Sequence, residues 1–517
     1  MDASQPAPST YWRQQIENAL LAPIRAVRLS YLPLLMVYFS YGAMGIIGVA
    51  QSFWIKKSLT WTPAELAALT IWFTLPWTIK MVFGELVDTV RLFGSQRRAY
   101  VFAGASMIAT ALILLSGSAG GWITFLPPNQ IYVIASLLSV TGLVLQDVVA
   151  DAMSTEVVPR VHPDGSPRPK QQIDHDLGMV QVLGRLSLSF GIFAVAGLSG
   201  WLAQMMPYDK VFLIGLVVPL ISVSGAILVR LETSEIRPID WRILGGGLAF
   251  GAVVAMLGLS GIPYSQEIIF VLSMTVVIWM LTRVTMEIDH VTRMRIAFAA
   301  IIIFAFRAVP GVGDGYSWFM IDVLKFDEAF FGVLGQIGAG VAIVAAWMLS
   351  DIVTRKPVAQ VLLWITILAT VLSLPSLLLV FQVHTYTEQM FGVGARGIAL
   401  FDTIATSPFA QLSMIPLLTL VAVYAPAGHR ATWFALMASL MNLALSASEL
   451  FTRYLNTAFA VTQESYEGLG RLMITVGFLG LVPLLAVPLL RREEARQAAS
   501  SAPAPEELRA QSPSNAL

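Results

Sequence analysis

A small set of charged side chains lies inside long apolar segments of this 517-residue chain. The set comprises Lys80, Asp147, Asp151, Arg185, Arg307, Asp314, Asp402 and Glu449. A charge in the bilayer interior costs about 2.5–3.5 kcal/mol on insertion scales, so such residues persist where they face a cavity or a partner. Solute binding, ion binding and proton transfer are the chemistry that charged residues perform in this setting.

Arg185 and Arg307 occupy corresponding depths in two different apolar segments. At 1.5 Å of rise per residue, each lies roughly 14–17 Å from the nearer segment end. That depth is close to the middle of a hydrocarbon core about 30 Å thick. Two guanidiniums facing one cleft would bind an anion, and a carboxylate fits their fork. The alternative is that an Asp in its own half neutralises each arginine.

Asp147 and Asp151 are four residues apart, so they share one face of a helix. Two carboxylates this close resist ionising together, which predicts a proton-coupling site. The alternative is an ion-pair cluster with Lys80 and Arg185. Lys80 and Gln146 complete the expected solute-binding set, and Asp402 is expected to serve as an outer gate or as a further coupling carboxylate.

The segment Arg307-Ala-Val-Pro-Gly-Val-Gly-Asp-Gly315 concentrates one Pro and three Gly within six residues. This composition predicts an interrupted helix, and carriers place binding groups at interrupted helices. We therefore expect Asp314 to bind solute. The alternative is a packing kink, which leaves the buried Asp unexplained.

The composition requires these residues to be positioned by membrane-spanning helices. The chain is 56% hydrophobic and 12% charged, with a mean hydropathy of +0.72, and an average soluble domain carries about twice that charged fraction. A span needs about 20 apolar residues, which predicts fourteen spans, or twelve if 242–283 lies on the surface. The predicted spans cover 31–55, 64–86, 99–117, 130–153, 176–204, 209–230, 242–261, 265–283, 296–322, 329–350, 357–382, 396–424, 429–456 and 469–490.

The spans divide the chain into two six-helix halves, 31–230 and 296–490, joined by a linker over 231–295 with a helical hairpin. Residues 1–30 are expected to be cytoplasmic with an interfacial helix, and 491–517 a disordered cytoplasmic tail. Lys and Arg concentrate in alternate loops, which predicts that both termini are cytoplasmic in a multi-pass protein of the cell membrane.

Each half carries a helix that ends in Asp before a short basic turn, which is typical of the major facilitator plan of two related halves. These motifs are expected to have gating or structural roles. They comprise Gly84, Asp88, Arg97 and Arg98 in the first half, and Asp351 and Arg355 in the second.

Several classes of function are disfavoured by what the sequence lacks. The chain contains no Cys, its five His form no cluster, and no phosphate-binding G-x-x-x-x-G-K-[ST] loop is present. No metal, cofactor, ATP-driven step or enzymatic activity is therefore expected. The formal net charge of zero gives no attraction to nucleic acid. We expect a monomer whose partners are the lipid bilayer, a small solute and protons.

The motifs combine into a recognisable pattern. They are Pro76-Trp77-x-x-Lys80, Gly84-x-x-x-Asp88, Gly94-x-x-Arg97-Arg98-x-Tyr100, Asp147-Val-Val-Ala-Asp151-Ala-Met153, Gly184-Arg185, Pro310-x-x-x-Asp314, Phe326, Phe331-Gly332, Asp402, Met414-Ile-Pro416, Pro426, Ala431-Thr432-x-Phe434-Ala435 and Asn442. With these, the chain resembles the folate–biopterin transporter family, a branch of the major facilitator superfamily.

The resemblance implies a proton-linked carrier of folate- or pterin-like anionic solutes. It also implies functional roles for Lys80, Asp147, Asp151, Arg185 and Asp314. The sequence departs from the family at Arg307, at His429-Arg430 and in its extra hairpin. Two alternatives therefore stay open: a major facilitator carrier of an unrelated metabolite, and a non-transporting membrane assembly factor.

Overall fold

The computed structural model describes residues 27–95, 97–162, 164–228, 239–260, 262–286, 289–423 and 430–501. These residues are almost entirely helical, and their only β-pairings are isolated bridges such as Leu92 with Ser95. Twelve helices in the described part of the chain are long and apolar enough to cross a membrane. All twelve fall on predicted spans, so the predicted all-α polytopic class is confirmed, and the predicted spans 296–322 and 429–456 are not among the twelve.

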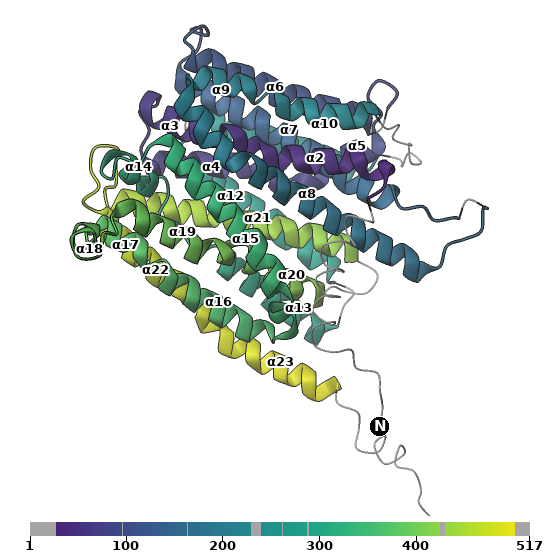
Figure 1. The fold of residues 1–517 in the computed structure, drawn as a ribbon. Coiled ribbons are helices and arrows are strands. Elements are labelled where there is room, and N and C mark those ends of the chain that lie inside the picture. Colours follow the sequence, from purple (N-terminus) through teal and green to yellow (C-terminus); the bar gives the residue numbers. More distant parts are fainter. Residues whose placement is uncertain are drawn as a thin grey trace, which may run out of the picture.

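The N-terminal half is a bundle of continuous and kinked helices, drawn in purple to teal in Figure 1. Its helices are α2 (Leu32–Ala43), α3 (Gly48–Ser58), α4 (Pro63–Thr78), α5 (Lys80–Thr89), α6 (Arg98–Ala119), α7 (Pro128–Glu156), α8 (Lys170–Met205), α9 (Tyr208–Ile214) and α10 (Val217–Leu228). A short 3₁₀ turn at Leu29–Tyr31 precedes α2, and another at Met44–Ile47 links α2 to α3.

The C-terminal half is a second bundle, drawn in green to yellow in Figure 1. Its helices are α13 (His290–Arg307), α14 (Gly315–Asp322), α15 (Glu328–Arg355), α16 (Val358–Leu372), α17 (Leu374–Val380), α18 (His384–Phe391), α19 (Ala395–Leu412), α20 (Met414–Val423), α21 (Arg430–Ala458), α22 (Leu469–Leu481) and α23 (Val487–Ser501). A 3₁₀ turn over Val482–Ala486 joins the last two.

Small residues set the spacing between helices inside the N-terminal half. A Cβ on Gly104 of α6 would lie 2.7 Å from the carbonyl oxygen of Gly142 on α7, so these helices cross almost in backbone contact. Gly42 of α2 and Gly191 of α8 make a similar close crossing. Lipid offers no hydrophobic drive for helix association, and close packing through small residues supplies the attraction instead.

The two halves make close contacts at the end of the bundle that carries the α3–α4, α14–α15 and α21–α22 connections, on the left of Figure 1. We call it the outer end, after the predicted topology, and the opposite end the inner end. A Cβ on Gly200 of α8 would lie 2.5 Å from Cα of Gly332 on α15. Gln463 bridges from the α21–α22 loop to the carbonyl oxygens of Leu59 and Trp61. The structure is therefore closed at its outer end.

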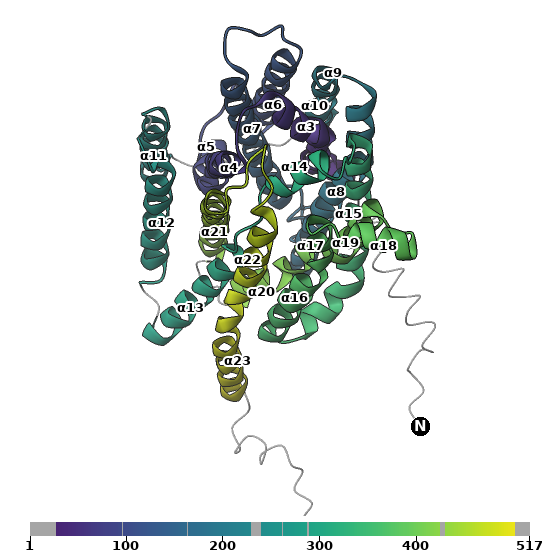
Figure 2. The same cartoon turned by 90° about the vertical axis from the view of Figure 1, so that its left-hand side faces the viewer.

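The predicted central hairpin consists of α11 (Trp241–Leu259) and α12 (Ser265–Val284), and it stands at one side of the bundle in Figure 2. Helix α11 packs on the N-terminal half, where the backbone N–H of Asp240 donates to Glu85 at 2.8 Å. Helix α12 packs on α21, where Arg453 pairs with Glu267 at 3.1 Å. The hairpin thus spans the seam between the halves, and both of its helices are among the twelve candidate spans.

Two predictions concern the chain ends. Helix α23 continues to Ser501, so the disorder predicted from residue 491 does not begin there. The sequence after residue 490 is rich in Arg, Glu and Ala, which are good helix formers. Its polar composition, by contrast, predicts disorder. Most of the predicted interfacial helix and the final residues 502–517 lie outside the described part of the chain.

Candidate functional site

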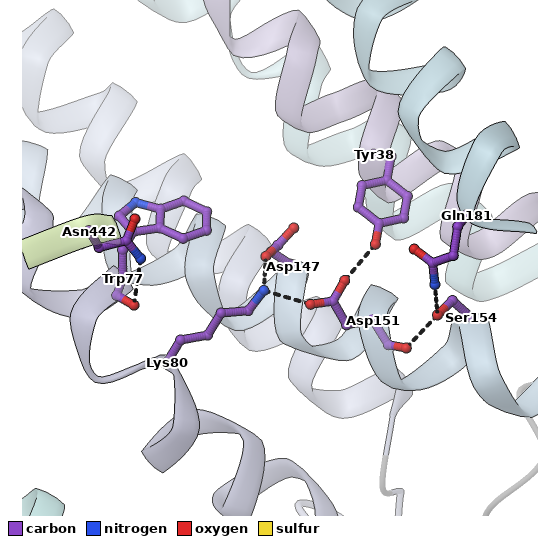
Figure 3. A network of polar contacts seen from close by, with 8 residues as sticks. All are labelled: Tyr38, Trp77, Lys80, Asp147, Asp151, Ser154, Gln181 and Asn442. Carbon is purple, nitrogen blue, oxygen red and sulfur yellow. Dashed lines mark hydrogen bonds and ion pairs between the residues drawn. The ribbon is translucent and has the colours of Figure 1, made fainter. Parts of the chain in front are cut away.

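Lys80 lies between the two carboxylates that the sequence placed on one helical face. Its Nζ is 2.5 Å from Asp147 Oδ2 and 2.6 Å from Asp151 Oδ2. On its other side, Asp151 accepts a 2.7 Å hydrogen bond from the hydroxyl of Tyr38. Figure 3 shows the lysine reaching from its helix into the gap between the two acids. The predicted i, i+4 relationship therefore creates a shared cation site.

A break in the second span directs Lys80 into this position. Pro76 lies inside α4, and the backbone leaves helical geometry at Ile79 before α5 begins at Lys80. At the break, the carbonyl oxygen of Trp77 accepts a 3.2 Å hydrogen bond from the side-chain amide of Asn442 on α21. Because α4 ends at Thr78, Trp77 O lies in the last turn of that helix, where carbonyl groups lack their usual helical partners, and it can bond across the interface between the halves.

Arg185 supplies a second cation beside the Lys80 cluster. It is exposed on α8, close enough to Tyr38, Tyr41 and Asp147 to interact with them electrostatically. The described residues provide no hydrogen bond or ion pair to its side chain. The guanidinium is therefore available to a ligand from outside the chain.

Gln146 points away from this cluster, although it is next to Asp147 in sequence. Its side chain is buried, and its amide donates to the carbonyl oxygen of Val101 and the hydroxyl of Ser222, both at 3.0 Å. These partners tie α7 to α6 and α10 inside the N-terminal half. The contacts are those of a helix-packing residue.

Arg307 lines a cavity that does not include Arg185. The volume of this cavity is 440 Å³, and all of its lining residues belong to the C-terminal half. Its polar lining includes Thr366 of α16, Ser413 between α19 and α20, and Ser448 of α21. The Nε of Arg307 is buried and has no hydrogen-bond partner. The structure therefore does not bring the two arginines together around this cavity, and their predicted common cleft finds no support in its lining.

The helix interruption predicted from the Pro- and Gly-rich segment is confirmed. Helix α13 ends at Arg307, α14 begins at Gly315, and Gly313 adopts a φ of +76° that favours glycine. The unwound stretch presents Asp314 to a cavity of 430 Å³ between the halves, which we call the outer cavity. It is lined by Gly48, Val49, Gln51, Ser52, Phe53, Ile55, Leu66, Thr70, Tyr132, Asp314, Ser317, Trp318, Ile321 and Phe331.

Three side chains of α21, which the sequence analysis missed, hold this unwound backbone. The Ser448 hydroxyl donates to Val309 O at 2.6 Å, the Gly311 N–H donates to Thr452 Oγ1 at 2.9 Å, and the Asn456 amide donates to Val312 O at 3.0 Å. A four-residue spacing places all three on one helical face. That spacing, opposite a predicted helix break, was the signal available in the sequence.

Asp402 lies on α19 within the C-terminal half. Its Oδ1 is buried without a hydrogen-bond partner, and Tyr316 lies within electrostatic range. Glu449 of α21 is within electrostatic range of Asp314. The acids of the C-terminal half are thus separate from the Lys80 cluster, where both carboxylates share one cation.

The inner-end motif of the first half forms a compact network around Arg97. Its guanidinium is 2.8 Å from Asp88 and 2.5 Å from Glu156, and it donates to Val87 O at 3.2 Å. Arg98 is exposed and lies over the ring of Phe102, while Gly84 has open space around it. The side chains of the corresponding Asp351 and Arg355 lie outside the described part of the structure.

Comparison with known proteins places this geometry in a family. The model of the BT1 family matches residues 42–504. The chain belongs to the BT1 family. Curated relatives include the folate-biopterin transporter of Synechocystis sp., which is 25% identical over 89% of this chain and 81% of its own length. A probable folate-biopterin transporter 2 of Arabidopsis thaliana is 23% identical over 86% and 79%, and folate transporter 1 of Plasmodium falciparum 21% over 84% and 74%.

These relatives confirm the resemblance drawn from the motifs, and they are named as transporters. Solved structures extend the fold beyond the BT1 family. A peptide transporter POT in complex with alafosfalin has a TM-score of 0.60 at 18% identity and covers 90% of this chain and 94% of its own. A POT family transporter in complex with 5-aminolevulinic acid has a TM-score of 0.62 at 13% identity, with 89% and 96% covered. The BT1 chain therefore shares their transporter fold.

Proposed function

We propose that this BT1 protein is a secondary active carrier that moves a folate- or pterin-like anionic solute together with protons by alternating access. The substrate class follows from the curated relatives. The observation that carries the proposal is the unpaired guanidinium of Arg185 beside Lys80, Asp147 and Asp151.

Anion recognition is assigned to Arg185 with Lys80. A guanidinium binds a carboxylate through two parallel hydrogen bonds, and Arg185 has no partner among the described residues that would compete. Lys80 adds a second positive charge a short distance away. Arg307 lines a separate cavity within the C-terminal half. We therefore propose the solute site around Arg185 and Lys80, and we do not include Arg307 in it.

Proton coupling is assigned to the carboxylates that share Lys80. Two acids four residues apart share one lysine, whose positive charge offsets their mutual repulsion. An anionic solute that attracts Lys80 weakens its hold on Asp147 and Asp151, and one of them then takes up a proton. Solute binding and protonation therefore favour each other. Asp402, which is not among the acids that pair with Lys80, remains a predicted further coupling site.

Alternating access is supported by the asymmetry between the ends. The outer end is closed by contacts between the halves, including the Gly200–Gly332 crossing, while Arg185 and half of the Asp151 side chain are exposed. In the proposed topology, with both termini cytoplasmic and the protein working as a monomer in the cell membrane, this is an inward-facing state. Rocking of the two halves would expose the same site on the other side.

Uptake by purified protein in liposomes tests the proposal. Labelled folate is expected to accumulate under an inward proton gradient and to stop accumulating when a protonophore collapses it. Arg185→Ala should lower uptake at least tenfold, while Arg471→Ala, an exposed arginine of α22, should not. A panel of pterins, peptides and organic acids in which only an unrelated solute accumulates would reject the substrate class.

A counterflow assay, which measures exchange of labelled for unlabelled solute, distinguishes proton coupling from solute binding. Asp147→Asn should abolish gradient-driven accumulation but retain exchange of labelled for unlabelled folate, because exchange needs no net proton movement. Asp164→Asn, in the exposed loop between α7 and α8, is the matched control. Undiminished accumulation by Asp147→Asn would remove this residue from the coupling mechanism.

A further inference from the structure

The outer cavity lies between the two halves, at the membrane depth next to the closed outer end. Helices α3, α4 and α7 line it on one side, and α14 and α15 line it on the other. Its 430 Å³ falls within the range of about 300–1,000 Å³ that small-molecule sites occupy. A site built from both halves is well placed to hold part of a transported solute.

Asp314 is the charged group of this cavity. Its side chain makes no cap hydrogen bond to α14, and no hydrogen bond or ion pair joins it to any other described residue. None of the cavity's lining residues is Lys, Arg or His. Glu449 is a second acidic residue within electrostatic range of Asp314. The cavity therefore disfavours an anionic group and favours one that donates hydrogen bonds.

Besides the aliphatic side chains of Val49, Ile55, Leu66 and Ile321, the lining is aromatic and polar. Phe53 and Phe331 meet edge to face with ring centroids 5.4 Å apart, and Trp318 and Tyr132 complete the aromatic walls. Gln51, Ser52, Thr70 and Ser317 add hydrogen-bonding groups. Aromatic walls bind a flat ring by stacking and edge contacts, so the cavity suits a planar heteroaromatic group.

The cavity and the Arg185 cluster, which α2, α5, α7 and α8 of the N-terminal half form, lie at different depths in the bundle. Thr70 lies eight residues before the end of α4 at Thr78, which corresponds to roughly 12 Å along the axis of that helix, and Lys80 follows the break. The cavity with Asp314, which favours a hydrogen-bond donor, is the outer of the two sites, and the cluster with Arg185 and Lys80 is the inner one. A solute that fills both must carry a planar hydrogen-bond donor at one end and an anionic group at the other.

We propose that the outer cavity binds the 2-amino-4-oxopteridine head of the solute, with the Asp314 carboxylate accepting hydrogen bonds from the 2-amino group and the adjacent ring N–H. Two neighbouring N–H donors on one edge match a carboxylate in the way that a guanidinium does. The glutamate tail then extends toward Arg185 and Lys80. This inference rests on the proposed function and adds the orientation of the solute and the residue that reads its head.

Cysteine protection tests the orientation without requiring transport. The chain has no Cys, so Ser317→Cys reports on the outer cavity and Gln181→Cys, on α8 four residues from Arg185, reports on the inner cluster. Pterin and folate should each slow maleimide labelling of Ser317→Cys severalfold, while p-aminobenzoylglutamate should protect only Gln181→Cys. Protection of Ser317→Cys by p-aminobenzoylglutamate but not by pterin would overturn the proposal.

Asp314→Asn tests the hydrogen bonds while retaining the side chain's shape. Wild-type protein should bind folate about 10- to 100-fold more tightly than its 2-desamino-2-methyl analogue, because hydrogen bonds to a charged group are lost. Asp314→Asn should reduce that ratio to a few-fold, and Glu464→Gln, in the exposed α21–α22 loop, should preserve it. Binding is measured by thermal shift in detergent.

The outcomes distinguish the two proposals. If wild-type protein neither binds nor transports folate, the proposed function fails. If it transports folate and Asp314→Asn keeps the full preference for the 2-amino compound, only the assignment of the pteridine head to the outer cavity fails. If Asp314→Asn does not fold, the labelling of Ser317→Cys still decides.

Discussion

Lys56 of α3 and Asp322 of α14 form an ion pair of 2.6 Å that joins the two halves at the outer end. Lys57 and Glu328 form a second pair of 3.2 Å beside it, and the Tyr208 hydroxyl donates to the same glutamate at 2.7 Å. Both pairs must separate before the outer cavity can open outward. They therefore favour the closed outer end seen here.

Lys56→Met is expected to shift the population toward an outward-open state. The side chains of Lys56 and Asp322 are 12% and 34% exposed, so this partly buried pair should contribute about 1 kcal/mol or more and its loss should shift the population at least about fivefold. Spin labels on Trp122→Cys and Glu464→Cys, in outer loops of the two halves, should show longer distances by pulsed electron resonance. Lys210→Met, which breaks a pair within one half, should leave the distances unchanged; an equal response would contradict a gate at Lys56.

Gly332→Ala is expected to impair closure of the outer end. The added Cβ would lie 2.8 Å from Cα of Gly200 and 2.9 Å from the carbonyl oxygen of Gly197. Overpacking of this kind costs about 1–3 kcal/mol, which should lower uptake roughly tenfold and lengthen the same label distances. Gly251→Ala on α11 meets no atom within 4 Å and should remain fully active. Normal uptake by Gly332→Ala would show that this crossing is not needed for the cycle.

Lys80→Met is expected to abolish uptake and to destabilise the protein by up to about 3 kcal/mol. Removing one partner of a buried ion pair leaves uncompensated charge, although the 30% exposure of Lys80 moderates the loss. Asp147→Asn added to Lys80→Met should restore part of the thermal stability but not the uptake. Lys356→Met, an exposed lysine at the end of α15, controls for lost charge. If the double variant were less thermally stable than Lys80→Met, Lys80 would not be the cation that the two acids share.

The adjacent Arg97 and Arg98 allow a matched comparison at the inner end. Arg97 is 3% exposed and bonded to two acids, so Arg97→Ala should destabilise the N-terminal half by about 3–5 kcal/mol. Arg98→Ala removes an exposed cation over Phe102 and should cost under about 1 kcal/mol. Thermal unfolding in detergent measures both. Equal losses would mean that the network around Arg97 contributes little.

The sequence by itself determined the class of protein, twelve of the fourteen predicted spans and the broken helix at Arg307–Gly315. These features depend on local composition: apolar length fixes a span, and Pro with Gly prevents a continuous helix. It also determined that Asp147 and Asp151 share a face, because helical periodicity is local. The helical end of the chain up to Ser501 was missed because polarity was read as disorder.

Only the tertiary structure decided which charges face one another. The sequence gives the depth of a residue in the membrane but not the direction in which its helix face points, and each residue rotates that direction by about 100°. Arg185 and Arg307 lie at matching predicted depths, yet Arg307 lines a cavity within its own half while Lys80 reaches across to two acids. Helix rotation is set by packing between segments distant in sequence, such as Gly42 against α8, so no local pattern could supply it.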